Sequence, residues 1–104
     1  MKVTPWNNGM HLRSGGGYGF TIKQKDMDIF RREWRVVRLK LDGILDYIEV
    51  NIDKDSFWNH SCSHLIKKEI GVWFRVNHII PWRKAHPPQL SLEHTALNKF
   101  KLKK

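Results

Sequence analysis

Two β-rich runs joined by Asp42-Gly43 constrain the fold of this chain more than any other feature of the sequence. Residues 34–41 and 44–52 both alternate between apolar and polar side chains, which is the period of a strand with one buried face. Asp-Gly is the pair that a two-residue type I′ turn prefers, because both central positions of that turn need a positive φ. We therefore expect an antiparallel hairpin.

The turn also predicts the register of this hairpin. With Leu41 opposite Ile44, one face collects most of the apolar side chains and the other becomes polar. The apolar face then carries Val37, Leu39, Leu41, Ile44, Ile48, Val50 and Ile52. We expect the hairpin to bury this face and to expose the other one, which carries Arg38, Lys40 and Tyr47.

Three further segments complete the expected secondary structure. Residues 18–22 alternate as a strand does. Residues 53–77 begin with helix-starting polar residues and then repeat apolar side chains at spacings of three and four, which predicts one amphipathic helix. Residues 90–102 fit either a hairpin or a helix, because periodicity does not separate the two over so short a span.

These elements predict an α+β fold, with a small antiparallel sheet of three to five strands packed against one main amphipathic helix. The chain has 104 residues, close to the common size of one domain. Residues 1–16 are rich in Gly and Asn and contain Pro5, so we expect a flexible N-terminal arm there. Residues 17–104 would then form a single basic domain.

The charge of the chain favours an anionic partner. Nineteen Lys and Arg residues against ten Asp and Glu give a net charge of +9 at pH 7. Such an excess attracts phosphates, although it also keeps a small protein soluble. We therefore expect a non-catalytic domain that contacts nucleic acid or another polyanion.

The sequence also predicts the surroundings of the protein. Cys62 is the only cysteine, so no intrachain disulfide can form, as is usual in a reducing compartment. No signal peptide and no membrane-spanning run is recognisable, which favours the cytoplasm. No phosphate loop and no complete metal-ligand pattern is present, so we expect no cofactor and no metal. The oligomeric state stays open, and a homodimer is compatible with the sequence.

The candidate nucleic-acid-binding residues are basic side chains with aromatic neighbours. We expect one group to follow the first strand of the hairpin, and a second to follow the exposed side of the helix, together with His64. These residues are Arg31, Arg32, Arg35, Arg38 and Lys40 with Tyr47, and then Lys67, Lys68 and Arg75. The terminal lysines, Lys99, Lys101, Lys103 and Lys104, form a short basic tail.

A third group rests on a resemblance. The segment Gly17-Tyr18-Gly19-Phe20-Thr21-Ile22 resembles the aromatic strand motif of RNA-recognition and cold-shock domains. The resemblance implies that Tyr18 and Phe20 stack on bases. A place for both rings in the core would explain the alternation of the strand equally well.

A second resemblance points to an enzyme. Asn77-His78-Ile79-Ile80-Pro81 followed by His94 and Asn98 resembles the C-terminal part of the HNH nucleases. The resemblance implies that His78 is a general base, that Asn98 orients it and that His94 is a metal ligand. Asn77 stands where the family more commonly has an acidic residue, so the enzymatic hypothesis is a degenerate HNH-like nuclease.

The histidines near Cys62 and the aromatic residues support two more hypotheses. His60 and His64 could share one helical face near Cys62, as zinc ligands do, but no partner pair stands elsewhere in the sequence. The chain could also be a protein-interaction module, dimeric or not, that uses exposed Trp and Phe side chains.

Overall fold

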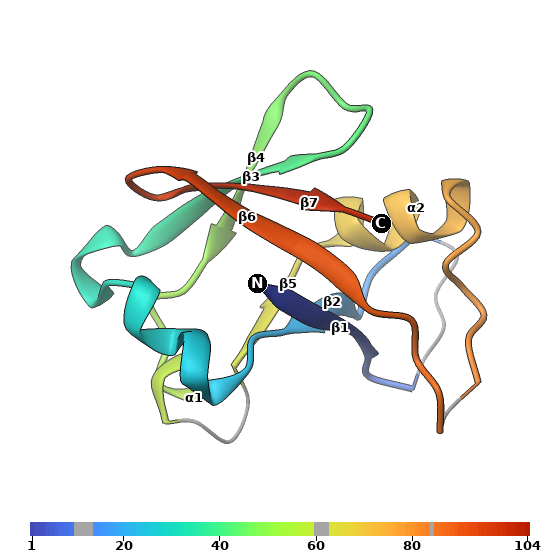
Figure 1. Cartoon of the computed structure of the whole chain (residues 1–104), viewed down its shortest axis with the longest axis horizontal. Helices are drawn as coiled ribbons and strands as arrows, with labels where there is room; N and C mark the ends of the chain where they lie inside the picture. Colours follow the sequence, from blue (N-terminus) through green and yellow to red (C-terminus); the bar gives the residue numbers. More distant parts are fainter. Residues whose placement is uncertain (10–13, 60–62, 84) are drawn as a thin grey trace.

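The computed structural model describes residues 1–9, 14–59, 63–83 and 85–104. Within these residues the chain forms seven strands: β1 (Lys2–Asn7), β2 (Tyr18–Thr21), β3 (Val36–Leu41), β4 (Tyr47–Asn51), β5 (His64–Ile66), β6 (Leu90–Ala96) and β7 (Lys99–Lys103). They lie side by side in the order β4-β3-β7-β6-β1-β2-β5. The two outer strands, β4 and β5, also contact each other, so the sheet curves into a nearly closed barrel (Figure 1).

The helices of the described part are all short. They are the α-helices α1 (Asp55–Trp58) and α2 (Lys68–Val76) and the 3₁₀ helices η1 (Gln24–Ile29) and η2 (Arg32–Trp34). The helix α2 lies at one end of the barrel (Figure 1), where the indole N–H of Trp73 donates to the carbonyl oxygen of Asp42 at 2.8 Å. It closes an end of the barrel and does not cover a sheet face.

The expected fold of three to five antiparallel strands on one main helix is therefore wrong. Each strand has one apolar face, and these faces close over a shared core instead of packing against a helix. The sheet is also mixed, because β3 and β7 run parallel while the other neighbouring pairs are antiparallel. Near-closure is favourable because it leaves little unpaired strand edge.

The single helix expected over residues 53–77 is also wrong. The segment contains α1, then β5, then α2. Lys67, with φ of −160°, is extended and separates β5 from α2, and β5 pairs with the outer edge of β2. The apolar spacing of three and four predicts a helix correctly only within α2, where Ile70, Trp73 and Phe74 are buried. In residues 64–66, pairing with β2 produced a strand where the spacing predicted a helix.

The hairpin of β3 and β4 is confirmed, but with another register. Lys40 lies opposite Tyr47, whereas the expected register places Leu45 opposite Lys40. The pairing is therefore shifted by two residues. Asp42 and Gly43 do form a turn, in which the N–H of Ile44 donates to the carbonyl oxygen of Leu41 at 2.9 Å. Of these two central residues only Gly43 has a positive φ, so the turn is not type I′.

The even shift keeps the two faces of the hairpin as expected, because side chains alternate with a period of two. Val37, Leu39, Leu41, Val50 and Ile52 are buried. Ile44 belongs to the widened loop instead of the core and is 46% exposed. The apolar pattern therefore predicted the faces correctly and the loop length incorrectly.

The N-terminal segment is not a loose arm, since residues 2–7 form β1. This strand pairs with β2 on one side and β6 on the other, so it lies inside the sheet. Val3 and Pro5 are buried, with Thr4 and Trp6 facing the other way. The residues Asn8 and Gly17 lie between β1 and β2, where the N–H of Asn8 donates to the carbonyl oxygen of Gly17 at 3.0 Å.

The C-terminal segment forms a hairpin and not a helix. The strands β6 and β7 pair antiparallel, with Leu97 in the turn at φ of 44°. The parallel pairing of β7 with β3 then joins this hairpin to the first one. Buried side chains from both hairpins meet in one hydrophobic cluster of the described residues, where Phe30 and Phe100 stack with ring centroids 4.8 Å apart.

Candidate functional site

The outer face of β3 and β7 carries a row of cations. Alternation buries Leu39 and Phe100 and leaves the residues on either side of each facing outward. The parallel register then places two cations of β3 opposite two cations of β7. We call this set the basic strip, and it consists of Arg38, Lys40, Lys99, Lys101 and Lys103.

An aromatic ring lies among these cations. Tyr47 of β4 is 39% exposed. The Arg38 guanidinium lies 6.0 Å from the centroid of this ring and the Lys99 ammonium 5.6 Å from it. Both distances are within the range of cation–π attraction, so two strands hold their cations around one ring.

Acidic side chains stand beside the basic strip. Glu49 lies opposite Arg38 on β4, and Glu93 lies opposite Lys101 on β6. Asp42 also makes an ion pair with Lys101 at 3.8 Å, with both side chains partly exposed. These carboxylates flank the strip, and its centre consists of cations facing cations.

Two pairs of cations face each other directly within the strip. Arg38 lies opposite Lys99, and Lys40 lies opposite Lys101. Like charges in directly opposed positions destabilise a sheet. One cation of each pair also has a carboxylate opposite it on its other side, Glu49 for Arg38 and Glu93 for Lys101, whereas Lys40 lies opposite Tyr47 and Lys99 opposite Ala96, so the repulsion within the strip is only partly offset.

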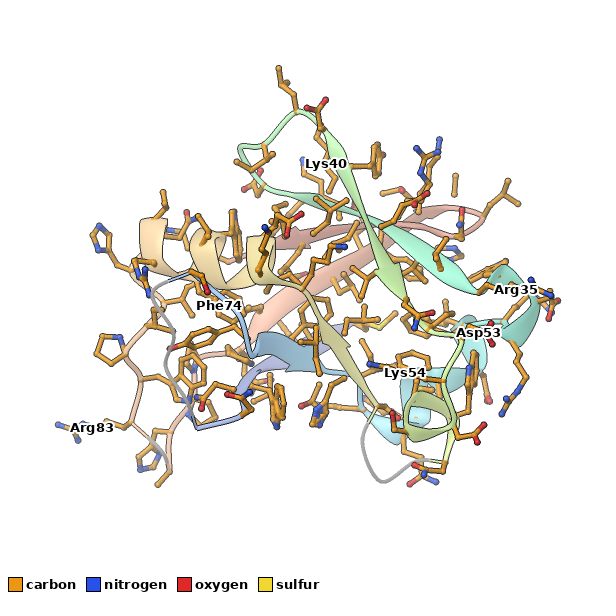
Figure 2. All side chains as sticks on the ribbon, turned by 180° about the vertical axis from the view of Figure 1, so that it is seen from behind. Arg35, Lys40, Asp53, Lys54, Phe74 and Arg83 are labelled. Carbon is orange, nitrogen blue, oxygen red and sulfur yellow. The ribbon has the colours of Figure 1, made fainter. Side chains whose placement is uncertain are left out.

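The first group of predicted basic residues is divided between two places. Arg38 and Lys40 lie on β3, but Arg31, Arg32 and Arg35 lie in and around η2, before the strand begins. The Arg32 guanidinium lies 5.1 Å from the Trp58 ring. Figure 2 shows Arg35 at one end of the molecule and Arg83 at the other. The expected continuous row along one strand is therefore wrong.

The second group does not form one helical stripe. Lys67 is the extended residue before α2, and Lys68 and Arg75 are exposed residues of α2 itself. Arg75 lines a pocket at the end of the barrel. His64, predicted for the same helix, belongs to β5.

The aromatic rings of the third group belong to the core. Tyr18 is 3% exposed and Phe20 is 0% exposed. The Tyr18 ring packs edge-on against Phe74 and Trp82. The structure thus matches a core role for this strand, and neither ring offers an open face on the outside of the sheet.

The residues of the nuclease resemblance are not brought together. His78 follows α2 and borders a hollow with Leu90, the first residue of β6. Asn98 lies beyond the far end of β6, where its side-chain N–H donates to the Val36 carbonyl oxygen at 3.1 Å. The seven residues of β6 span roughly 20 Å. His78 and Asn98 therefore do not share a site.

His94, the proposed metal ligand, has structural contacts instead. The His94 ring stacks on Phe100 with centroids 4.7 Å apart and bonds the Leu97 carbonyl oxygen. His60 and Cys62 lie outside the described residues. In the described ranges, no group of three or more His, Cys, Asp and Glu side chains is arranged to hold a metal ion.

His64 gives the fold a pH-dependent contribution. Its ring lies 4.4 Å from the Trp6 ring, and burial, together with the positive charge of Lys54, lowers the pKa of His64 below its usual value of 6.5. The unfolded chain then binds a proton at His64 more readily than the folded chain does. The contribution of neutral His64 to the free energy of unfolding is therefore fully present above pH 6.5 and decreases as the pH falls below that value.

We expect this loss of stability to depend on the imidazole. Urea unfolding at neutral pH and at a pH about one unit below the usual pKa should show a smaller difference for His64→Gln than for the unsubstituted chain. His86→Gln, at an exposed histidine, is the control. An equal pH dependence in all three proteins would contradict the role of His64.

Sequence reasoning missed the β7 half of the basic strip. The pattern of charges predicts only a basic tail for Lys99, Lys101 and Lys103. The alternation of these lysines with Phe100 and Leu102 is the pattern of a half-buried strand, and it is the signal that could have identified them. Their place beside β3 depends on a parallel pairing that no local pattern indicates.

Comparisons with protein-family models, with curated proteins and with solved structures found no match to this chain. None of the helices in the described part is long and apolar enough to cross a membrane.

Proposed function

We propose that this chain is a non-catalytic module that binds nucleic acid through the basic strip and Tyr47. The observation that carries the proposal is the pair of like-charged rows, Arg38 opposite Lys99 and Lys40 opposite Lys101. Glu49, Glu93 and Asp42 offset the repulsion between these rows only in part, and a bound row of phosphates would offset the rest.

The aromatic ring favours a single strand over a duplex. Tyr47 is partly exposed between Arg38 and Lys99. Proteins that bind single strands combine a cationic groove along the backbone with aromatic rings on which bases stack. The acidic residues Glu49 and Glu93 border the strip, so they would confine the phosphates to its centre.

The test removes two facing cations. In Arg38→Gln/Lys99→Gln, binding to a fluorescent single-stranded oligonucleotide should weaken, and the slope of log affinity against log salt should become shallower by about 1.4, because each phosphate contact contributes about 0.7. Fluorescence anisotropy at several salt concentrations measures both quantities.

The matched control is Lys23→Gln/Lys25→Gln, which removes the same charge from two exposed residues of the β2–β3 connection. This variant should keep most of the affinity and salt slope of the unsubstituted chain. Equal losses of affinity in the two double variants would mean that net charge, and not the basic strip, determines binding, which would contradict the proposal. An absence of binding by the unsubstituted chain would also refute it.

A further inference from the structure

A pocket of about 860 Å³ opens at the end of the barrel beside α2. Its walls come from the end of β1, the start of β2, α2 and the segment between α2 and β6. They include Trp6, Tyr18 and Trp82 together with Asn7 and Arg75, and Tyr18 contributes little of the surface because it is 3% exposed. Its size is that of pockets that hold small organic ligands.

The walls of the pocket suit a flat, apolar ring. The Trp82 ring packs edge-on against Tyr18, with centroids 6.3 Å apart, and against Phe74 at 6.2 Å. These contacts fix Trp82 from one side, while the residue itself is half-buried. A ring held by its neighbours in this way binds a stacked ligand at little cost in side-chain entropy.

The polar groups of the pocket suit an anion-bearing ligand. Arg75 supplies a positive charge, and Asn7 supplies an amide whose Oδ1 accepts the N–H of Gly9 at 2.7 Å. Amide side chains hydrogen-bond the edges of bases. Among the described residues that line the pocket, none is acidic.

The pocket adjoins further cations. A neighbouring hollow of about 410 Å³ shares Pro81 and Trp82 with it and is bordered by the cations Arg83 and Lys104. Lys104 directly follows β7, whose residues Lys99, Lys101 and Lys103 belong to the basic strip. Positive side chains therefore lead from the strip to the hollow beside the aromatic pocket, and Figure 2 shows Arg83 extending outward at that end.

We propose that the aromatic pocket binds one unstacked base of a single strand whose phosphates follow β7. This inference rests on the proposed function and specifies it, since it assigns the base-reading step to Trp82 and its neighbours. The cations outside the pocket favour a nucleic acid over a proline-rich peptide, which also binds aromatic grooves but brings no row of negative charge.

The experiment compares two strands that differ in their bases alone. A fluorescent DNA oligonucleotide of about ten nucleotides and an abasic strand of the same length are titrated against the unsubstituted chain and against Trp82→Leu. The DNA should bind the unsubstituted chain more tightly than the abasic strand does, by about 5- to 150-fold for each base that stacks, on Trp82 and on Tyr47. Trp82→Leu should reduce this difference by about 5- to 150-fold, which leaves only the contribution of stacking on Tyr47, and should keep its affinity for the abasic strand.

Trp34→Leu is the matched control, because Trp34 is a half-buried tryptophan of η2 that does not line the pocket. It should keep the preference for the base-bearing strand. A comparison of the two strands on the unsubstituted chain needs no variant, so equal affinities would overturn the pocket even where Trp82→Leu fails to fold.

The outcomes separate the two proposals. Equal affinity of the unsubstituted chain for both strands would overturn the pocket together with base stacking on Tyr47, and would leave phosphate binding by the cations of the basic strip standing. Binding of neither strand would overturn the proposed function together with the pocket. Quenching of tryptophan fluorescence by a proline-rich peptide, with none by the DNA, would assign the pocket to a peptide instead.

Discussion

Phe100→Ala should lower the free energy of unfolding by about 3–5 kcal/mol, the usual cost of truncating a buried phenylalanine. Phe100 is fully buried, stacks on Phe30 and packs edge-on against Trp34 at 6.2 Å. Removing the ring leaves a cavity at the junction of β3 and β7, since Phe100 lies opposite Leu39. The strands around it are held by backbone pairing and cannot close the gap fully.

Urea unfolding followed by circular dichroism measures this loss. Leu45→Ala is the control, because Leu45 is 89% exposed in the loop between β3 and β4 and surface changes usually stay within about 0.5 kcal/mol. A loss below about 1 kcal/mol for Phe100→Ala would contradict the central place of this ring in the core.

The same substitution should affect binding. Phe100 lies between Lys99 and Lys101 on β7, so its packing holds both lysines of the basic strip in register with β3. A domain stabilised by the usual range of about 5–15 kcal/mol would keep little of its stability after this change. Phe100→Ala should therefore lose its binding to an oligonucleotide at a lower urea concentration than Leu45→Ala does.

The parts of the fold that could be predicted from the sequence are those that depend on neighbouring residues. The alternation in residues 36–41 and 47–51 identified β3 and β4 and their buried faces, because side chains on a strand alternate wherever the strand lies. It also separated Arg38, Lys40 and Tyr47 from the core. The register failed because it depends on the turn geometry, and Asp42 does not adopt the conformation that type I′ requires.

The partners of the strands could not be predicted in this way. The placement of β1 inside the sheet joins Lys2 to Ser91, and β7 pairs with β3 at Lys99 and Arg38. Such contacts are far apart in the sequence, and no local pattern specifies them. The basic strip is built from one of these pairings, so only its β3 half was predictable.

The expected helix shows how a helical period can mislead. The predicted helix includes both Leu65 and Ile70 among its apolar residues, and both are buried. Leu65 is buried as a residue of β5, opposite Phe20, and Ile70 is buried as a residue of α2. A short apolar run satisfies either element, and the free edge of β2 determined which one formed.

Gly71→Ala should destabilise the protein, against the usual effect of this substitution in a helix. Replacing glycine by alanine inside an exposed helix stabilises it by about 1 kcal/mol. A Cβ at Gly71, however, would collide with the carbonyl oxygen of Gly15 and lie 2.6 Å from its Cα. Both are backbone atoms, so no side chain can rotate away, and we expect a net loss of about 1–3 kcal/mol.

The contact between Gly15 and Gly71 also sets the position of the pocket. It fixes α2, which carries Arg75, against the segment that leads into Tyr18, and both of these residues line the pocket. Gly71→Ala should therefore reduce the preference for base-bearing over abasic strands as well as the stability.

The control for this prediction is Val76→Ala on the same helix, at a residue that is 69% exposed. Because alanine has the higher helix propensity and little packing is lost, its free energy of unfolding should be unchanged or slightly raised. If the backbone contact with Gly15 fixes α2, urea unfolding should show a lower free energy of unfolding for Gly71→Ala and an unchanged or slightly higher one for Val76→Ala. A stabilised Gly71→Ala would mean that α2 can move away from Gly15, and the walls of the pocket would then not be fixed by this contact.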